Sequence, residues 1–318
     1  MKRNYKILVL VVLFAVASCS FTTKSFDDPN KDKTLIELIT YVLANGHYDP
    51  DEINDSFSKE VYEDYIESLD PMKRFFYASD IKEFNAYKDK IDDQIKNSEL
   101  DFFNLTYNRL VKRKEEAKAL YQDILETPFD FSKEGTFNTN YEEKEYADSR
   151  EEMRERWRKQ LKVSTLASYY DKIREQQRQL EENPDYVKKT KAELETAARE
   201  VTRNSMEEYY NFNDDMLRKD WFSVYVNSIV GEFDPHSFYF APQEKDRFDI
   251  AMSGQLEGIG ARLQKKNDII TIIALISGGP AWRGEQVDVG DKILKVKQED
   301  EEQPVNVVGM RLDDAVKL

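Results

Sequence analysis

Between Leu35 and Val230, apolar residues recur at helical spacing, with polar breaks between the runs. The first run comprises Leu35, Leu38, Ile39 and Val42. Its spacing of three and four residues is typical of one face of a helix, and Asn45-Gly46 is a typical helix end. The same pattern predicts further helices over residues 53–69, 79–95, 100–126, 150–182, 185–211 and 214–230. Ser79 is the expected N-cap of the second of these, and Gly231 the expected C-cap of the last.

After Gly231 the pattern changes to short strands separated by glycine and proline. Residues 269–276 are a continuous, largely β-branched run, and residues 292–297 alternate between polar and apolar except at Ile293-Leu294. Strands are therefore predicted over residues 261–263, 269–276 and 292–297, and a final helix over residues 311–318. The chain is predicted to fold as a mainly α domain followed by a small α+β module.

The composition agrees with a largely helical chain, because glycine (11) and proline (9) are scarce among the 318 residues while charged residues reach 34%. The net charge of −15 repels phosphate backbones, so nucleic-acid binding would need a local basic stripe. One basic run, Arg109 with Lys112, Arg113 and Lys114, precedes Glu115 and Glu116. This mixture predicts a solvated helix face, and no nucleic-acid partner is expected.

The N-terminus has the pattern of a secretory signal, because basic residues precede the apolar run Ile7–Ala17. That run is too short to span a bilayer, which needs about 20 apolar residues. Val16-Ala17-Ser18-Cys19 resembles the lipobox of bacterial lipoproteins, in which cleavage exposes the cysteine for lipid attachment. Cys19 is the only cysteine in the chain, so it can form no internal disulfide. An ordinary secretory signal with an incidental cysteine is the alternative.

These patterns divide the chain into four segments. We expect a lipoprotein signal peptide (1–18), a lipidated flexible tether (19–33), a helical N-terminal domain (34–232), and a linker with the small module (233–318). The polar composition of residues 20–33, which include Pro29, favours a tether. The mature protein is expected in the cell envelope, in the periplasm, held on a membrane by its lipid.

Four glycine-containing motifs follow one another in the module. They are Leu256-Glu257-Gly258-Ile259-Gly260-Ala261, residues 277–281 (SGGPA), residues 289–296 (VGDKILKV) and residues 308–316 (VGMRLDDAV). A single G-x-G is weak evidence, and a plain turn would explain it. In this order the four motifs resemble the PDZ domains of bacterial processing proteases. Residues 232–239, with Leu69-Asp70 and residues 78–81, resemble the tail-specific, carboxy-terminal processing branch in particular.

The resemblance implies that a substrate's C-terminal residues pair with the strand Ala261-Arg262-Leu263 while the substrate's carboxylate binds loop amides. Amides of Ile259, Gly260 and Ala261 would donate to that carboxylate. The residues that the resemblance assigns to peptide binding are Leu256, Gly258, Ile259, Gly260, Ala261, Leu263, Leu312 and Val316. Of these, Leu256, Ile259, Leu312 and Val316 are the candidates for an apolar pocket, although each could equally be ordinary core.

The family's catalytic residues cannot be carried over to this chain. Its nucleophilic serine and its lysine base lie in a domain that follows the PDZ module, and the sequence stops at Leu318. His47 and His236 are too few for a triad or a zinc site, and no metal or cofactor is expected. We expect the chain alone to have no peptidase activity. The PDZ-like module is expected to be incomplete at its C-terminus and labile, because a further strand follows the last helix in that fold.

The favoured interpretation is the N-terminal and PDZ portion of a bacterial envelope tail-specific serine endopeptidase that recognises apolar C-terminal tails. Its expected partners are substrate tails, the membrane and, as in the resembling family, an adaptor lipoprotein on the helical domain. One alternative is a free-standing peptide-binding adaptor lipoprotein without enzymatic activity. Another is a structural helical lipoprotein that keeps a vestigial module. A catalytic domain encoded in frame after Leu318 would favour the protease.

Overall fold

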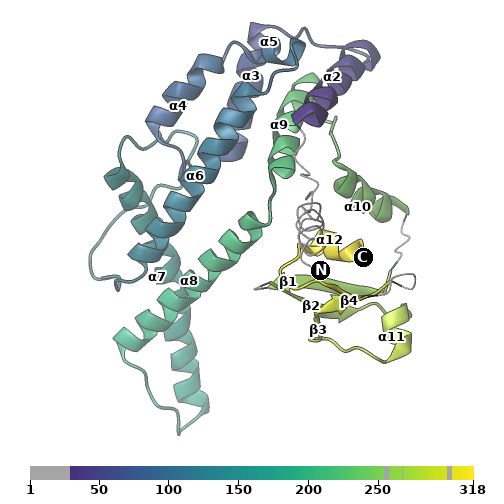
Figure 1. Cartoon of the computed structure of the whole chain (residues 1–318). Coiled ribbons are helices and arrows are strands. Elements are labelled where there is room, and N and C mark those ends of the chain that lie inside the picture. The colour runs from purple at the N-terminus through teal and green to yellow at the C-terminus, as the bar shows by residue number, and fades with distance from the viewer. Residues whose placement is uncertain (1–28, 254–257, 267, 299–302) are drawn as a thin grey trace, which may run out of the picture.

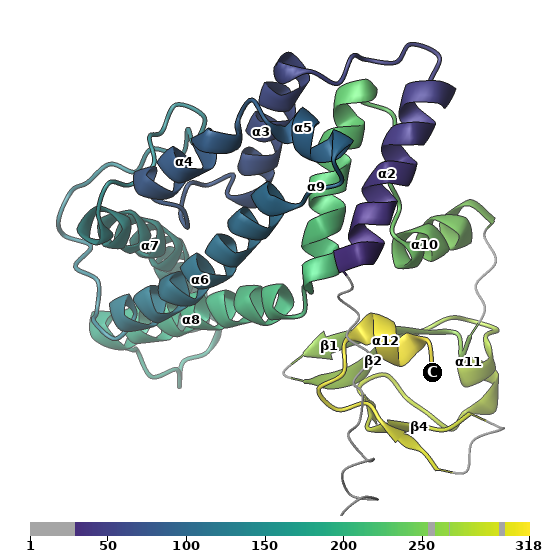
Figure 2. The same ribbon diagram turned by 45° about the horizontal axis from the view of Figure 1, so that its top comes forward.

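The computed structural model describes residues 29–253, 258–266, 268–298 and 303–318. The signal peptide, Cys19 and Leu256 lie outside these residues. A large helical domain and a small α+β module lie side by side (Figures 1 and 2). The helices before the module are α2 (Pro29–Gly46), α3 (Asp55–Leu69), α4 (Ala78–Phe84), α5 (Ile91–Lys96), α6 (Asp101–Ile124), α7 (Arg150–Glu182), α8 (Lys191–Asp214), α9 (Arg218–Phe233) and α10 (Pro242–Ser253).

Aromatic side chains from three helices form the centre of the helical domain. Tyr65 of α3, Phe102 and Phe103 of α6, and Tyr225 of α9 are all buried. The Tyr65 and Tyr225 rings lie 4.9 Å apart in an edge-on arrangement, and the Phe103 and Tyr225 rings stack at 5.7 Å. Such pairs contribute about 0.5–1.5 kcal/mol each beyond the area that they bury. The sequence pattern predicted the helices, and these rings hold them together.

The basic run on α6 contradicts the prediction of a solvated face. Arg109 and Arg113 both pair with Asp80 of α4, whose side chain is fully buried, and Lys114 is itself buried. Burial disfavours the ionised form of Asp80, but hydrogen bonds from Arg113, the Tyr77 backbone N–H and Arg109 outweigh it and lower its pKa. The prediction was wrong because the partner carboxylate comes from a helix that is distant in sequence.

Several predicted helix boundaries also need correction. Helix α2 starts at Pro29, so the last residues of the expected tether are helical. Proline suits a first helical turn, where its missing N–H has no partner to lose. The predicted helix 79–95 is broken into α4, a 3-10 turn (Asn85–Tyr87) and α5, and its N-cap is Tyr77 in place of Ser79. Helix α8 begins only at Lys191, behind a Thr190–Glu193 capping box, and α9 continues through Gly231 to Phe233.

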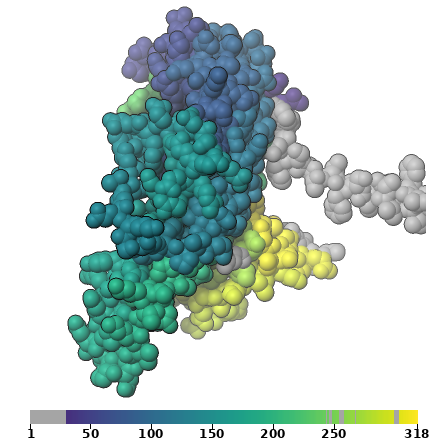
Figure 3. All heavy atoms as spheres, turned by 90° about the vertical axis from the view of Figure 1, so that its left-hand side faces the viewer, coloured from purple at the N-terminus to yellow at the C-terminus, as the bar shows by residue number. Residues whose placement is uncertain are grey.

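Helices α7 and α8 form a long antiparallel hairpin joined by residues 183–190. In Figure 1 the hairpin extends away from the other helices, and Figure 3 shows its end projecting from the body of the protein. The buried apolar residues of α7, Met153, Trp157 and Leu161, all lie in its first half. Further along, the two helices are joined by a buried hydrogen bond between the Thr165 and Thr202 hydroxyls, 2.9 Å apart.

The module contains a three-stranded antiparallel sheet in the order β1-β2-β3 and a two-stranded sheet, β4-β5. Its elements are β1 (Ala261–Lys266), β2 (Ile269–Leu275), α11 (Pro280–Gly284), β3 (Lys292–Ile293), β4 (Lys295–Val296), β5 (Val305–Asn306) and α12 (Leu312–Val316). Ile270, Val307 and Ala315 are buried at its centre. The expected fold class, a mainly α domain followed by a small α+β module, is confirmed.

The single strand expected over residues 292–297 is divided between the two sheets. The division falls at Leu294, where the alternation of polar and apolar residues breaks in the sequence. The Leu294 side chain is exposed, and its carbonyl accepts a hydrogen bond from the Val307 N–H at 3.0 Å. The chain therefore changes partner strands at this residue.

Candidate functional site

Strand β1 is at one edge of the three-stranded sheet. It pairs with β2 along one side, and no other strand among the described residues pairs with its second side. Its side chains alternate between half-buried and exposed, with Ala261, Leu263 and Lys265 on the half-buried face. Helix α12 packs against β1 (Figure 2). An edge strand beside a helix provides unpaired backbone groups for an added strand and a wall for its side chains.

The glycine loop that precedes β1 is held against the turn before α11. The Ile259 carbonyl accepts from the Ala281 N–H at 2.8 Å, and the Gly260 carbonyl accepts from the Ile276 N–H at 2.9 Å. Gly260 has φ +73°, a conformation that glycine adopts without strain, and a Cβ at this position would lie 3.0 Å from the Gly279 Cα. Glycine is needed here for both its backbone conformation and its size. Gly258, with φ +133°, turns the chain into the loop.

The structure does not gather the predicted apolar pocket into one enclosed cluster. Leu263 and Leu312 are half-buried and pack against the core of the module. Val316 is 63% exposed and Ile259 is 50% exposed. Leu256 lies outside the described residues, so the composition of the pocket stays a prediction.

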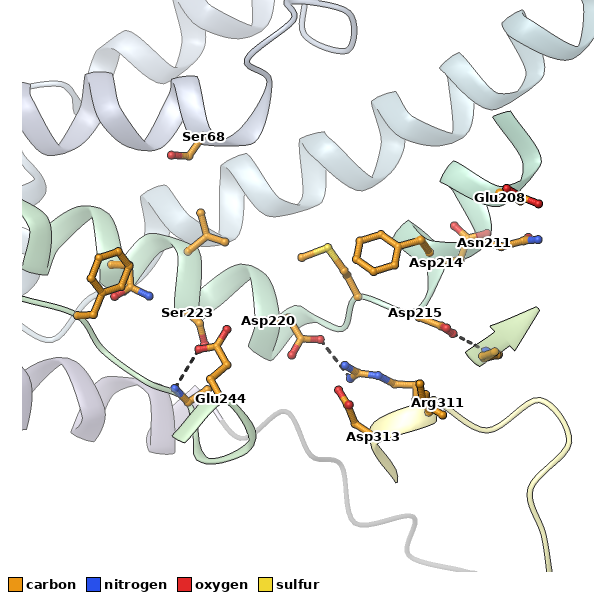
Figure 4. A pocket seen from close by; sticks show the side chains of 18 of the residues that line it. Ser68, Glu208, Asn211, Asp214, Asp215, Asp220, Ser223, Glu244, Arg311 and Asp313 are labelled. Carbon is orange, nitrogen blue, oxygen red and sulfur yellow. Dashed lines mark hydrogen bonds and ion pairs between the residues drawn. The ribbon is translucent and has the colours of Figure 1, made fainter. Parts of the chain in front are cut away.

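A cleft of about 1380 Å³ lies between the module and the helical domain (Figure 4). The second half of β1 and the start of α12 form one wall, and the end of α8 and one face of α9 form the other. Leu263 and Leu312 line the cleft as well as packing against the module core. The cleft therefore lies beside the contact between β1 and α12.

Three ion pairs connect the walls of this cleft. Lys265 of β1 lies 2.6 Å from Asp215, and Lys266 lies 2.9 Å from Glu208. Arg311, directly before α12, lies 3.1 Å from Asp220 of α9 (Figure 4). Strand β1 and the residue before α12 are thus both linked by ion pairs to the region where α8 meets α9.

Sequence reasoning missed the residues of these pairs. One signal was available for Lys265, because strand alternation places it on the same face as Ala261 and Leu263, which is unusual for an unpaired lysine. Its partner could not be found from the sequence, because Asp215 lies 50 residues away in a different domain.

Two further titratable groups, His47 and Lys114, make structural contacts. The ring of His47 is held by the Asp49 carbonyl at 2.8 Å and by Asp234, with Nε2 3.9 Å from its carboxylate. Burial lowers the pKa of Lys114 to about 8, and its Nζ donates to Asn213 at 2.8 Å. Across the described residues, no three His, Cys, Asp or Glu side chains are placed to share a metal ion. No described helix combines the length and apolar character needed to cross a bilayer.

A family model described as "Tail specific protease N-terminal domain" matches residues 39–243, which include nearly all of the helical domain. The chain belongs to the tail-specific protease family. The tail-specific protease of Haemophilus influenzae is 28% identical over 276 residues, which are 86% of this chain and 37% of that protein. The resemblance found in the sequence motifs is confirmed.

Other relatives of the tail-specific proteases match a shorter part of the chain. The carboxy-terminal processing protease CtpA of Bacillus subtilis is 32% identical over 111 residues, 35% of this chain and 22% of its own length. A crystal structure of the PDZ domain of a Vibrio cholerae carboxy-terminal protease, solved in complex with peptide, is 52% identical. That match covers 20% of this chain and 63% of the other, with a TM-score of 0.19. The chain spans little more than a third of the length of its Haemophilus relative.

Proposed function

We propose that this chain is the substrate-recognition portion of a bacterial envelope serine endopeptidase that selects proteins by their apolar C-terminal tails. The observation that carries the proposal is the open edge of β1, with a glycine loop at its start and α12 beside it. Membership in the tail-specific protease family supports it. Cleavage is assigned to a catalytic serine and lysine outside these 318 residues.

In this proposal the tail adds to the sheet antiparallel to β1. Its backbone pairs with Ala261 and Leu263, and its terminal carboxylate lies at residues 258–261, where amides of Ile259, Gly260 and Ala261 donate to it. Leu312 and Val316 of α12 face the tail's apolar side chains, together with Ile259, and Leu256 stays a candidate from the sequence alone. Main-chain pairing supplies affinity for any extended tail, and the apolar contacts select among tails.

The carboxylate contact gives a direct test of tail recognition. A fluorescent peptide with an apolar C-terminus should bind the full chain at least about tenfold more tightly with a free carboxylate than with a C-terminal amide, because hydrogen bonds to a charged acceptor are the stronger kind. Fluorescence anisotropy measures both dissociation constants. Equal affinity of the two peptides, or binding by neither while β2 is protected from hydrogen exchange, would contradict the proposal.

We also propose that Cys19 carries the lipid that anchors the protein to a membrane. The basis is the lone cysteine behind a short apolar run. Expressed in a bacterial host, the Cys19→Ala form should move from the detergent phase to the aqueous phase, or remain unprocessed, because the acyl chains supply about 0.8 kcal/mol per buried methylene. Phase partitioning of the two forms compares them, and unchanged partitioning with normal processing would rule out lipidation.

A further inference from the structure

The geometry of β1 fixes where the rest of a bound substrate chain must run. A tail that is antiparallel to β1, with its carboxylate at the glycine loop, has its upstream residues beside Lys265 and Lys266. These two residues line the cleft between the module and the helical domain. At about 3.4 Å per residue, a tail occupies β1 with its last four or five residues, and the next three or four lie in the cleft.

The walls of the cleft carry an excess of negative charge. The basic residues that line it are Lys265, Lys266 and Arg311, and each already pairs with an acidic residue. Asp64 of α3 and Glu244 of α10 also line the cleft and add negative charge beyond those three pairs. Figure 4 shows Glu244 and Asp313 among the side chains that surround the space. A cationic segment would therefore be attracted here and an anionic one repelled.

A neighbouring carboxyl group is influenced by the same charge. Glu232 directly follows Gly231, which lines the cleft. Burial, a hydrogen bond with Glu60 and the nearby carboxylates of Glu60, Asp64 and Asp51 together raise the pKa of Glu232 to about 7, and burial is the largest of these causes. Asp64 lines the cleft, so part of this shift comes from a carboxylate of the cleft wall.

We infer that the cleft selects substrates by charge, favouring basic and rejecting acidic residues at about the fifth to eighth positions from the substrate's C-terminus. The inference rests on the proposed function, because it requires a tail bound along β1. It adds a second criterion to the apolar tail. Two proteins with identical final residues would be distinguished by the charge of the segment immediately upstream.

Three peptides of about twelve residues span both the groove and the cleft. They share the same apolar last four residues with a free carboxylate and carry lysine, serine or glutamate at the fifth to eighth positions from the C-terminus. At low ionic strength, charge interactions extend over about 30 Å before salt screens them. The lysine peptide should then bind the full chain about tenfold more tightly than the glutamate peptide, with the serine peptide between them. The ratio should fall toward one in high salt.

Matched variants separate the cleft from the net charge of −15. The double variant Asp64→Asn/Glu244→Gln removes two charges from the cleft walls. The control Glu181→Gln/Glu182→Gln removes two from the exposed end of α7, far along the chain from the cleft. The preference for lysine over glutamate should fall about threefold in the cleft variant and stay unchanged in the control. The serine peptide should bind all forms alike, which shows that the groove is intact.

The possible outcomes distinguish the two proposals. Carboxylate-dependent binding with equal affinity for the lysine and glutamate peptides would overturn charge selection and leave tail recognition standing. A preference reduced equally by both double variants would assign it to overall charge and likewise overturn the role of the cleft. Binding that does not depend on the terminal carboxylate would overturn tail recognition itself, and charge selection with it.

Discussion

Replacing Asp80 by alanine is expected to lower the free energy of unfolding of the helical domain by about 3 kcal/mol, because it leaves two half-buried arginines without their shared carboxylate. The Asp80 side chain is fully buried and accepts hydrogen bonds from Arg113, Arg109 and the backbone N–H of Tyr77. Loss of the Tyr77 contact also removes a capping interaction from the start of α4. Urea unfolding followed by far-ultraviolet circular dichroism measures the difference.

Glu83→Ala is the matched control for Asp80→Ala. Glu83 also pairs with Arg109, at 2.6 Å, but its side chain is 49% exposed, so its removal should cost less than about 1 kcal/mol. The pKa of Asp80 is lower in the folded chain than in the unfolded chain. Its contribution is therefore complete above the unfolded value of about 4 and is lost as the pH falls through the lower folded value. Similar losses in the two variants at neutral pH would show that burial of the Asp80 pair is unimportant.

Replacing Gly260 by alanine is expected to weaken binding of an apolar peptide with a free carboxylate by at least about tenfold. The added Cβ would lie 3.0 Å from the Gly279 Cα and 3.1 Å from the Pro280 Cδ, so the loop must move away from the turn that holds it. Its φ of +73° adds strain that glycine does not have. Displaced loop amides would no longer converge on the carboxylate. Fluorescence anisotropy with the same peptide measures the change.

Gly278→Ala separates backbone strain from collision. Gly278 has φ +80°, close to that of Gly260, but a Cβ there would meet nothing within 4 Å. This variant should lose less than about threefold in affinity. Hydrogen exchange across β2 in both variants shows whether the module is still folded. A Gly260→Ala protein with a protected β2 and normal peptide binding would exclude the loop from the binding site.

The sequence was sufficient to predict most of the helical domain because its long helices are separated by clear breaks, such as Asn183-Pro184 after α7. Helix α7 has the predicted limits, Arg150–Glu182, with Ser149 as its N-cap. Prediction failed where a helix is interrupted by local hydrogen bonding, as between Phe84 and Ile91. It also failed where short strands exchange partners, as at Leu294. In both places the deciding contacts are local and involve few residues, so the apolar pattern does not record them.

The candidate site was predicted only in part. Glycine spacing located the loop before β1, because positive φ restricts the residue type strongly. The cleft is formed by residues from α3, α8, α9, α10, β1 and α12, and no local pattern relates them. The ion pairs Lys265–Asp215 and Arg311–Asp220 join residues 50 and 91 positions apart, so only the folded chain brings them together. Charge on such a surface is a property of the tertiary structure.

The hairpin of α7 and α8 has a consequence for the motions of the domain. Helix α7 has 33 residues, about 50 Å at 1.5 Å per residue, yet its buried apolar residues end at Leu161. Phe131 and Phe129, in the connection before α7, still contact Tyr169 of α7 and Glu195 of α8. Beyond these contacts the two helices chiefly hold each other, so the free energy required to open them decreases toward residues 183–190. The ends of the two helices can separate and rejoin while the aromatic centre remains intact. The domain thus behaves as a rigid base with an arm whose end opens locally. This local opening occurs far more often than unfolding of the whole domain.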